Sequence, residues 1–315
     1  MAKNYGLPYT GSKSKIAHWV VDNLPCGRVL IDAFAGGCAI THRALLSQKW
    51  QTIIANDING KYPQLFLDAI HGRYRDEKRW ISREDFERLK SQDAFVACCW
   101  SFGNNLRNYM YSQAIEPYKR ALHYAIVFND FEPMQELMPE VAQAVHDALQ
   151  GQNNLHDRRI TAQNVIVKTL KRITDDNFAH PVIQNNPLYQ TIRHTSRNTP
   201  SLNGLESLER LEILECLQVT SLSYDEIDIP DGAVVYCDPP YHACNKSLYD
   251  GTAKAFDHNA FYDWCVSVSK TNPIFISEYS IEDDRFEVVA EKQKMTSMSW
   301  KTAFNVTERL YTVKK

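Results

Sequence analysis

The sequence lacks the features that mark membrane or secreted proteins. No apolar run reaches the roughly 20 residues that a helix needs to cross a bilayer. The opening MAKNYGLPYTGSKSKIAHWV contains no apolar core of the kind that a signal peptide has. We therefore expect a cytoplasmic protein with no membrane partner.

Metal-binding cysteine pairs are also missing. The eight cysteines form no CxxC pair and no finger-like spacing, and several stand inside apolar runs. This pattern predicts buried free thiols in a reducing compartment. His258 has no partner at metal-binding spacing either, so we interpret it as structural and expect no metal.

A strong excess of one charge is absent as well. The chain has 35 Lys and Arg against 38 Asp and Glu, for a net charge of −3. This balance argues against a protein that binds nucleic acid over its whole surface, although a local basic face is still possible. The 44% hydrophobic content over 315 residues is ordinary for a globular protein with a buried core.

What the sequence does contain is a series of short apolar runs that alternate with helical stretches. Alternation of this kind predicts βαβ units, and hence an α/β fold with a mostly parallel sheet. Helices are expected at 41–48 and 207–217, and strands at 28–34, 51–59, 218–227, 234–240, 273–279, 286–293 and 309–315. Because 294–308 shows no convincing helix, the last two strands are expected to form an antiparallel end.

The middle of the chain interrupts this pattern with helices and polar loops. Residues 121–157 hold six acidic side chains and no Lys or Arg, whereas residues 158–199 hold seven basic and two acidic ones. The simplest organisation is an α/β domain built from 1–65 and 200–315, with an inserted, mainly helical domain at 66–199.

The stretch from Asp32 to Gly37, DAFAGG, follows a predicted strand and opens a predicted helix. Glycines at such a turn let the backbone approach a ligand closely. Asp57 ends the next strand 21 residues after Gly36, about where nucleotide-binding sheets carry an acid for ribose hydroxyls. The full GxGxxG is absent, which favours a ligand with ribose but no pyrophosphate, such as S-adenosylmethionine. The alternative is a pair of purely structural turns.

The run VVYCDPPY at 234–241 ends a predicted strand with two prolines, which cannot donate to a sheet ladder. The Asp238 carboxylate and the Pro239 carbonyl can each accept one hydrogen of an amino group, and the Tyr241 ring can stack on a planar base. The combination predicts methyl transfer to an amino nitrogen through positioning and electrostatic stabilisation. The structural alternative is a proline-stopped strand with a capping aspartate.

Four motifs resemble, in family order, those of the Dam-type adenine-N6 DNA methyltransferases of bacteria and their phages. They are LPYTGSKSKI (7–16), DAFAGGCAI (32–40), NDIN (56–59) and DPPY (238–241). The resemblance implies a Rossmann-like class I methyltransferase sheet, S-adenosylmethionine as cofactor, and double-stranded DNA as partner. It also implies a bacterial or phage-infected cytoplasm and a monomer or weak dimer, and it leaves open whether a restriction enzyme is paired with the protein.

The resemblance also implies roles for individual residues. The implied catalytic residues are Asp238, Pro239, Pro240 and Tyr241. The implied cofactor residues are Tyr9, Lys13, Asp32, Phe34, Gly36, Asp57, Asp225 and Asp238. Among them, Tyr9 and Lys13 would reach the methionine end, and Asp225 would contact the cofactor's adenine. Ser12 stands where the family usually has a second glycine before its lysine, and a solvated charge is the alternative for Lys13.

The insertion has the length that a target-recognition domain occupies in this family. The stretch SFGNNLRNYMYS (101–112) offers residue types that read base edges or fill the gap left by a flipped base, namely Asn105, Arg107 and Tyr109. A polar, aromatic loop packed between domains is an equal alternative. Phosphate contacts are expected from Arg158, Arg159, Lys168, Lys171 and Arg172, with an ordinary solvated face as the alternative.

The sequence therefore predicts a site-specific DNA methyltransferase that acts on N6 of a flipped-out adenine. The alternatives are the same chemistry on cytosine N4, an RNA base or a protein amide, and a DNA-binding module whose methylation site has decayed. The polar loop 242–256 is expected to act as a lid over the flipped base. Asp257 is expected to cap the helix that carries Phe261 and Trp264.

Overall fold

The computed structural model describes residues 5–74, 76–173, 215–241, 256–299 and 302–315. The chain forms two compact units, one made of residues 1–75 and 202–315 and the other of residues 76–201. Two predicted segments fall largely outside the described residues. They are the lid at 242–256, of which only residue 256 is described, and the helix at 207–217, of which only residues 215–217 are described.

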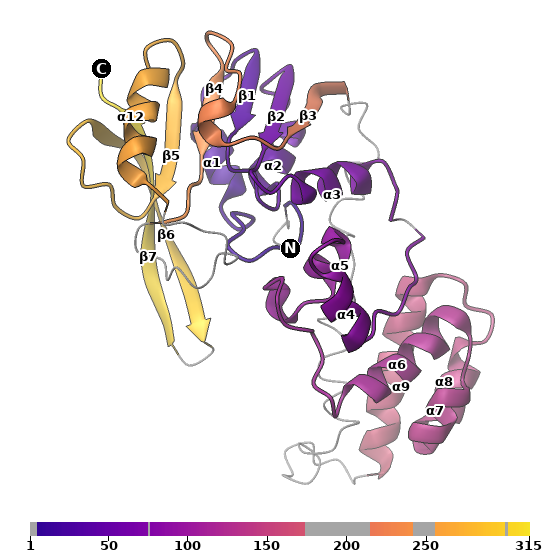
Figure 1. The fold of residues 1–315 in the computed structure, drawn as a ribbon. Helices are drawn as coiled ribbons and strands as arrows, with labels where there is room; N and C mark the ends of the chain where they lie inside the picture. The colour runs from indigo at the N-terminus through magenta and orange to yellow at the C-terminus, as the bar shows by residue number, and fades with distance from the viewer. Residues whose placement is uncertain (1–4, 75, 174–214, 242–255, 300–301) are drawn as a thin grey trace. The chain divides into compact units, whose positions relative to one another are not determined.

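The first unit is built on a seven-stranded sheet with the order β3-β2-β1-β4-β5-β7-β6 (Figure 1). Neighbouring strands from β3 to β5 pair in parallel, and β7 pairs antiparallel with both β5 and β6. The predicted α/β sheet with an antiparallel end is thus confirmed. The strands are β1 (Val29–Asp32), β2 (Thr52–Asn56), β3 (Leu217–Thr220), β4 (Val234–Cys237), β5 (Ile274–Glu278), β6 (Phe286–Ser299) and β7 (Thr302–Val313).

The third strand is shorter than predicted. It ends at Thr220, and a 3₁₀ turn, η5 (Tyr224–Glu226), follows. Two sets of hydrogen bonds explain this, because the Asn56 side chain accepts from the Leu222 amide at 3.0 Å and Ser223 forms a capping box with Glu226. Both interactions turn the chain away from the sheet, so the prediction of a strand through 218–227 is wrong beyond residue 220.

The last two strands are longer than predicted. They form a hairpin that runs through most of 294–308 and extends past the rest of the sheet (Figure 1). This stretch contains three Thr, one Val and one Phe, which suit strands, but its serines, Asn305 and charged residues hide the alternation. The prediction that strands stop at residue 293 and resume at 309 is therefore wrong.

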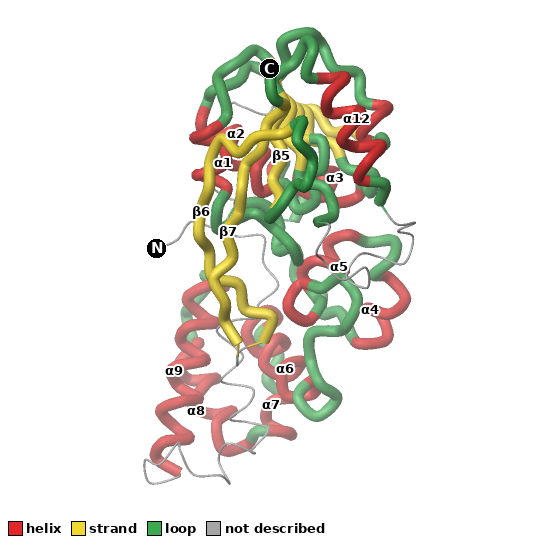
Figure 2. The backbone as a smooth tube through the Cα atoms, turned by 90° about the vertical axis from the view of Figure 1, so that its left-hand side faces the viewer, coloured by secondary structure: helices red, strands yellow, loops and turns green. Residues whose placement is uncertain are grey.

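Helices cover both faces of the sheet. The helix α12 (His258–Val268) lies on one side, and α1 (Ala17–Asn23) and α2 (Ala39–Ser47) lie on the other (Figure 2). Phe261 of α12 is fully buried in one cluster with Ile31 and Val235 from the central strands. A further helix, α3 (Lys61–Ile70), follows β2.

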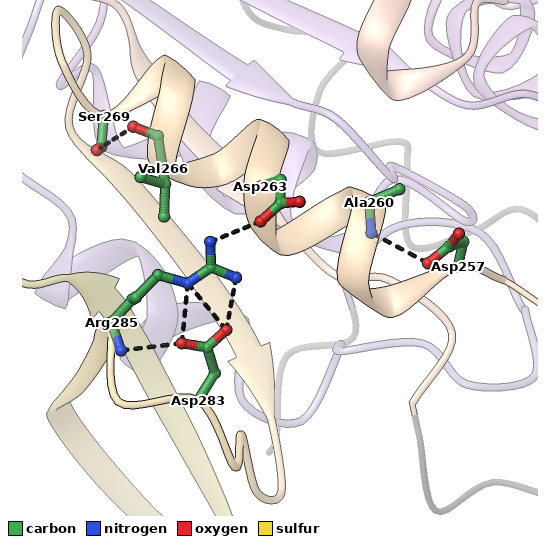
Figure 3. Close-up of polar contacts among 7 residues, drawn as sticks. All are labelled: Asp257, Ala260, Asp263, Val266, Ser269, Asp283 and Arg285. Atoms are coloured by element: carbon green, nitrogen blue, oxygen red, sulfur yellow. Dashed lines mark hydrogen bonds and ion pairs between the residues drawn. The ribbon is translucent and has the colours of Figure 1, made fainter.

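Polar contacts fix the start and the middle of α12 (Figure 3). The Asp257 carboxylate accepts from the Ala260 amide at 3.0 Å, which confirms the predicted cap. The Arg285 guanidinium donates to Asp263 at 2.6 Å and to Asp283 at 2.7 Å, so it ties the helix to the segment before β6. These groups are largely exposed, and they orient the helix more than they stabilise it.

The second unit is helical over most of its described residues. Its core gathers Met134, Val141, Val145 and Ile166, all nearly fully buried. Its helices are α4 (Arg83–Leu89), α5 (Ala94–Cys99), α6 (Glu116–His123), α7 (Glu132–Leu137), α8 (Pro139–Leu149) and α9 (Leu155–Ile173), with a 3₁₀ turn η1 (Phe102–Asn104) and a π turn η2 (Tyr124–Phe128).

Two other features bear on the predictions made above. The cysteines at described positions are free thiols, and most of them are buried. Within the described ranges, no helix combines the length and the apolar character that a bilayer crossing requires.

Candidate active site

Acidic residues stand at the carboxyl ends of adjacent parallel strands. Asp32 ends β1, Asp57 follows β2, and Asp238 follows β4. In the β1–β4 ladder Asp32 pairs with Tyr236, so Asp238 leaves the sheet close beside Asp32. The strand order reverses between β1 and β4, and open α/β sheets bind ligands at such a switch point.

Asp32 is almost completely buried. Its Oδ2 accepts from the Thr41 amide at 3.1 Å and from the Thr41 hydroxyl at 2.7 Å. Its Oδ1 is buried and has no hydrogen-bond partner within the described part of the chain. Burial raises the pKa of Asp32 to about 7, and the negative charges of Asp238 and Asp57 add to this effect. The three carboxylates therefore share one electrostatic environment.

The glycine turn is tied to Asp57. Gly36 has a φ of +47°, and its N–H donates to Asp57 Oδ2 at 2.9 Å, while Oδ1 accepts from the Asn59 amide at 2.8 Å. Burial raises the pKa of Asp57 above its ordinary value. A Cβ on Gly37 would lie 2.6 Å from the Cβ of Tyr9, so only glycine lets Tyr9 pack this closely on the turn. Tyr9 and Asp57 thus both contact the glycine turn.

An aromatic group lies next to Asp225. The rings of Phe34 and Tyr224 stack with their centroids 5.7 Å apart, and Phe256 approaches the edge of Phe34 at 5.9 Å. Asp225 is exposed and accepts from the Ser223 hydroxyl. Tyr224 was not predicted as a site residue, although it directly precedes a predicted acid, and Phe256 was predicted only as part of the lid.

Lys13 contacts the predicted catalytic turn. Its ammonium lies 2.6 and 2.7 Å from the two carboxylate oxygens of Asp238 and 4.5 Å from the centroid of the Tyr241 ring. The side chains of Lys13 and Asp238 are only 9% and 18% exposed, so the pair is shielded from water. Sequence reasoning expected Lys13 at the cofactor's methionine end, and it did not anticipate this ion pair.

Tyr241 is held at its far end by a residue that the sequence analysis missed. Its hydroxyl donates to Oε1 of Glu308, which is completely buried on β7. Burial raises the pKa of Tyr241 well above its ordinary value, so the phenol stays neutral and donates. One signal was available in the sequence, because Glu308 shares the strand face of buried Leu310 in an otherwise apolar alternation.

Two residues predicted to contact DNA are instead structural. Tyr109 is buried, and its hydroxyl donates to the Ile81 carbonyl at 2.7 Å. Arg158 is also buried, and its guanidinium donates to Asn129 and to the carbonyls of Ala125, Ile126, Leu149 and Gln152. The predictions of base contact by Tyr109 and phosphate contact by Arg158 are therefore wrong, because internal acceptors already occupy both donors.

The other predicted DNA residues differ in their surroundings. Asn105 Oδ1 accepts from the Arg107 amide at 3.0 Å, so its side chain shapes the loop, and Arg107 is half-buried. Burial lowers the pKa of Arg159 below its ordinary value, whereas Lys168 is exposed. The side chains of Lys171 and Arg172 lie outside the described residues. DNA contact by all six stays a prediction.

Metal ligands are not gathered in the described regions, where no three His, Cys, Asp or Glu side chains could hold an ion together. The functional groups described at the carboxyl edge of the sheet are acids, aromatic rings and a lysine.

Comparison with known proteins found similarity over part of the chain. Over 63 residues the chain is 40% identical to the Type II methyltransferase M2.HphI of Haemophilus parahaemolyticus, a stretch that is 20% of this chain and 18% of that relative. The chain thus matches about a fifth of that protein's length. Residues 9–135, which contain Tyr9, Lys13, Asp32 and Asp57, match the family of D12 class N6 adenine-specific DNA methyltransferases. The resemblance to adenine-N6 DNA methyltransferases is thereby confirmed for this part of the chain.

Proposed function

We propose that the protein is an S-adenosylmethionine-dependent DNA methyltransferase that modifies N6 of adenine. The observation that carries the proposal is the position of Asp238 beside Asp32 at the switch point of the sheet, with Lys13 in contact with both Asp238 and Tyr241. The family match over residues 9–135 supports the adenine-N6 class. The helical unit of residues 76–201 is proposed to recognise the DNA target.

The site fits S-adenosylmethionine in three respects. The buried Oδ1 of Asp32 is available to a donor group of a ligand. Asp57 is partly exposed at the glycine turn and would hold the ribose hydroxyls. The stacked rings of Phe34 and Tyr224, beside Asp225, offer an apolar surface for the adenine. When bound, this cofactor supplies an electrophilic methyl group on a sulfonium sulfur.

The protein's own residues would then position the target amine. Asp238 accepts one amino hydrogen, the Pro239 carbonyl accepts the other, and the Tyr241 ring stacks on the extruded base. Lys13 balances the charge of Asp238 before the base arrives, and it yields part of that carboxylate to the incoming amine. The methylated nitrogen is acidic, so its proton passes to Asp238 or to water, and no strong base is needed.

Methyl transfer from labelled S-adenosylmethionine to duplex DNA tests the proposal. We expect Asp238→Ala to lower transfer by about 100-fold or more while cofactor binding largely survives. Asp263→Ala serves as the control, because it removes an exposed acid on α12 that is remote from the catalytic turn. Transfer at the wild-type rate by Asp238→Ala would refute the assignment.

Asp57→Ala tests the cofactor side of the same site. We expect it to weaken S-adenosylmethionine binding by about 10-fold or more, because a ribose hydroxyl would lose a charged acceptor. Calorimetric titration measures this affinity, and an unchanged affinity would remove the ribose role from Asp57.

Mass analysis of the nucleosides in treated DNA and RNA separates the alternatives. N6-methyladenine in DNA is expected. Methylated cytosine N4 or a methylated RNA base would redirect the assignment to the same chemistry on another nucleic-acid substrate, and label transferred to protein would redirect it to a protein amide. Absence of cofactor binding would indicate a decayed DNA-binding module.

A further inference from the structure

Glu308 is an unusual residue for a buried position in a sheet. It lies on β7, one residue before the first residue that pairs with β5, it pairs with Lys292 of β6 in the strand register, and it is completely buried. Burial of a carboxyl group is costly unless hydrogen bonds compensate for the lost water. The Tyr241 hydroxyl provides one such hydrogen bond, so strand β7 and the end of the catalytic motif are connected directly.

The Tyr241 ring is restrained on three sides. Glu308 holds its hydroxyl, the Tyr279 ring stands perpendicular to it (88°) with the ring centroids 4.7 Å apart, and the Lys13 ammonium lies over its face at 4.5 Å. Tyr279 is itself fixed, because its carbonyl accepts from Arg309, the residue that follows Glu308. Two consecutive residues of β7 therefore hold both tyrosines.

We infer that Glu308 is a positioning residue that holds the plane of the Tyr241 ring ready for the target base. The inference rests on the proposed function, in which this ring stacks on the extruded adenine. An aromatic ring anchored only at its Cβ can tilt, whereas a hydrogen bond at the opposite end of the ring opposes the tilt. Stacking depends on the ring plane, so a preset plane places the amine correctly without reorganisation when the base enters.

Kinetics of Glu308→Ala, Glu308→Gln, Tyr241→Phe and the double variant Tyr241→Phe/Glu308→Ala test this role. We expect Glu308→Ala and Tyr241→Phe each to lower kcat by about 10-fold, with little change in KM for S-adenosylmethionine. The double variant should be no slower than either single one, because both changes break the same hydrogen bond. Glu308→Gln should recover most of the rate, since its amide oxygen still accepts from the phenol.

A fluorescent base in place of the target adenine gives a second readout. With 2-aminopurine at that position, stacking on Tyr241 quenches the emission of the flipped base, and Glu308→Ala should relieve this quenching while Glu308→Gln should not. Glu287→Ala, which changes an exposed acid on β6, serves as the matched control and should leave both readouts unchanged. Rate losses that multiply in the double variant, or a wild-type rate for Tyr241→Phe, would overturn the inference.

A coupling measurement separates this inference from the proposed function. Thermal unfolding of the wild type, Glu308→Ala, Tyr241→Phe and the double variant reports whether Tyr241 and Glu308 stabilise each other, and it needs no substrate. If the two residues are coupled in stability but the wild-type protein transfers no methyl group to DNA, the proposed function is refuted and the Tyr241–Glu308 hydrogen bond stands. Active wild-type protein without coupling would refute the positioning role alone. If Glu308→Ala does not fold, Glu308→Gln and Tyr241→Phe carry the comparison.

Discussion

The ammonium of Lys13 pairs with both carboxylate oxygens of Asp238, at 2.6 and 2.7 Å, although 225 residues separate the two in the chain. The contact joins the segment before α1 to the end of β4. It also brings a positive charge into a site that otherwise gathers three acids, Asp32, Asp57 and Asp238. The pair therefore compensates charge at the edge of the sheet.

Lys13→Met should destabilise the protein by about 2 kcal/mol, because it leaves the largely buried Asp238 carboxylate without its cation. Chemical denaturation measures the change in the free energy of unfolding. Lys15→Met is the matched control, since Lys15 is exposed in the same segment, and it should change stability by less than about 0.5 kcal/mol. Equal stabilities of the two variants would show that the ion pair contributes nothing to the fold.

Gly37→Ala should disturb the proposed cofactor pocket through Tyr9. The new Cβ would lie 2.6 Å from the Cβ of Tyr9, so one of the two segments has to shift. We expect cofactor affinity to fall by about 10-fold and stability to fall by about 1–3 kcal/mol. In Gly151→Ala the positive φ of +74° costs stability, but open space surrounds the new Cβ, so affinity should persist. Unchanged affinity in Gly37→Ala would contradict the packing argument.

Lys119 predicts a pH dependence of stability. Burial lowers its pKa from 10.5 to about 7. Between pH 7 and 10.5 the unfolded chain binds a proton that the folded chain has lost, so the free energy of unfolding rises with pH by up to about 1.4 kcal/mol per unit. Below pH 7 both states are protonated, and this contribution is constant.

Denaturation of the wild type and Lys119→Met across this pH window isolates the effect. The free energy of unfolding of the wild type should rise with pH relative to that of Lys119→Met, by up to about 1.4 kcal/mol per pH unit. The curve of Lys78→Met, at an exposed site in the same unit, should run parallel to the wild type. A Lys119→Met curve that runs parallel to the wild type over pH 7 to 10.5 would show that Lys119 has an ordinary pKa.

Arg158→Ala and Lys168→Ala should have opposite effects on stability and DNA binding. Removal of the Arg158 guanidinium leaves four carbonyls and Asn129 without their donor, so we expect a loss of about 3 kcal/mol or more. Lys168 is exposed, and its loss should leave stability intact while lowering DNA affinity and the salt dependence of binding. If Lys168→Ala bound DNA with the wild-type salt slope, Lys168 would make no phosphate contact.

Much of the sheet of the first unit could be predicted because its signals are local. Short apolar runs, the glycine turn at Gly36 and the prolines after Asp238 each act on a few neighbouring residues, so β1, β2, β4 and β5 lie close to the predicted ranges. Parallel strands present their carboxyl ends at one edge, which is why acids at strand ends could be expected to lie together. The β6–β7 hairpin was underestimated because polar residues interrupt its alternation.

The sequence by itself determined the sheet class, the acids at its carboxyl edge and the motif that ends in Tyr241, because backbone propensity and proline stops are properties of short segments. Only the tertiary structure decided that Lys13 meets Asp238, that Glu308 anchors Tyr241 across 67 residues, and that Arg158 lies inside its helical unit. A charged side chain looks the same in a sequence whether water or a buried partner surrounds it, and packing of distant segments makes that choice.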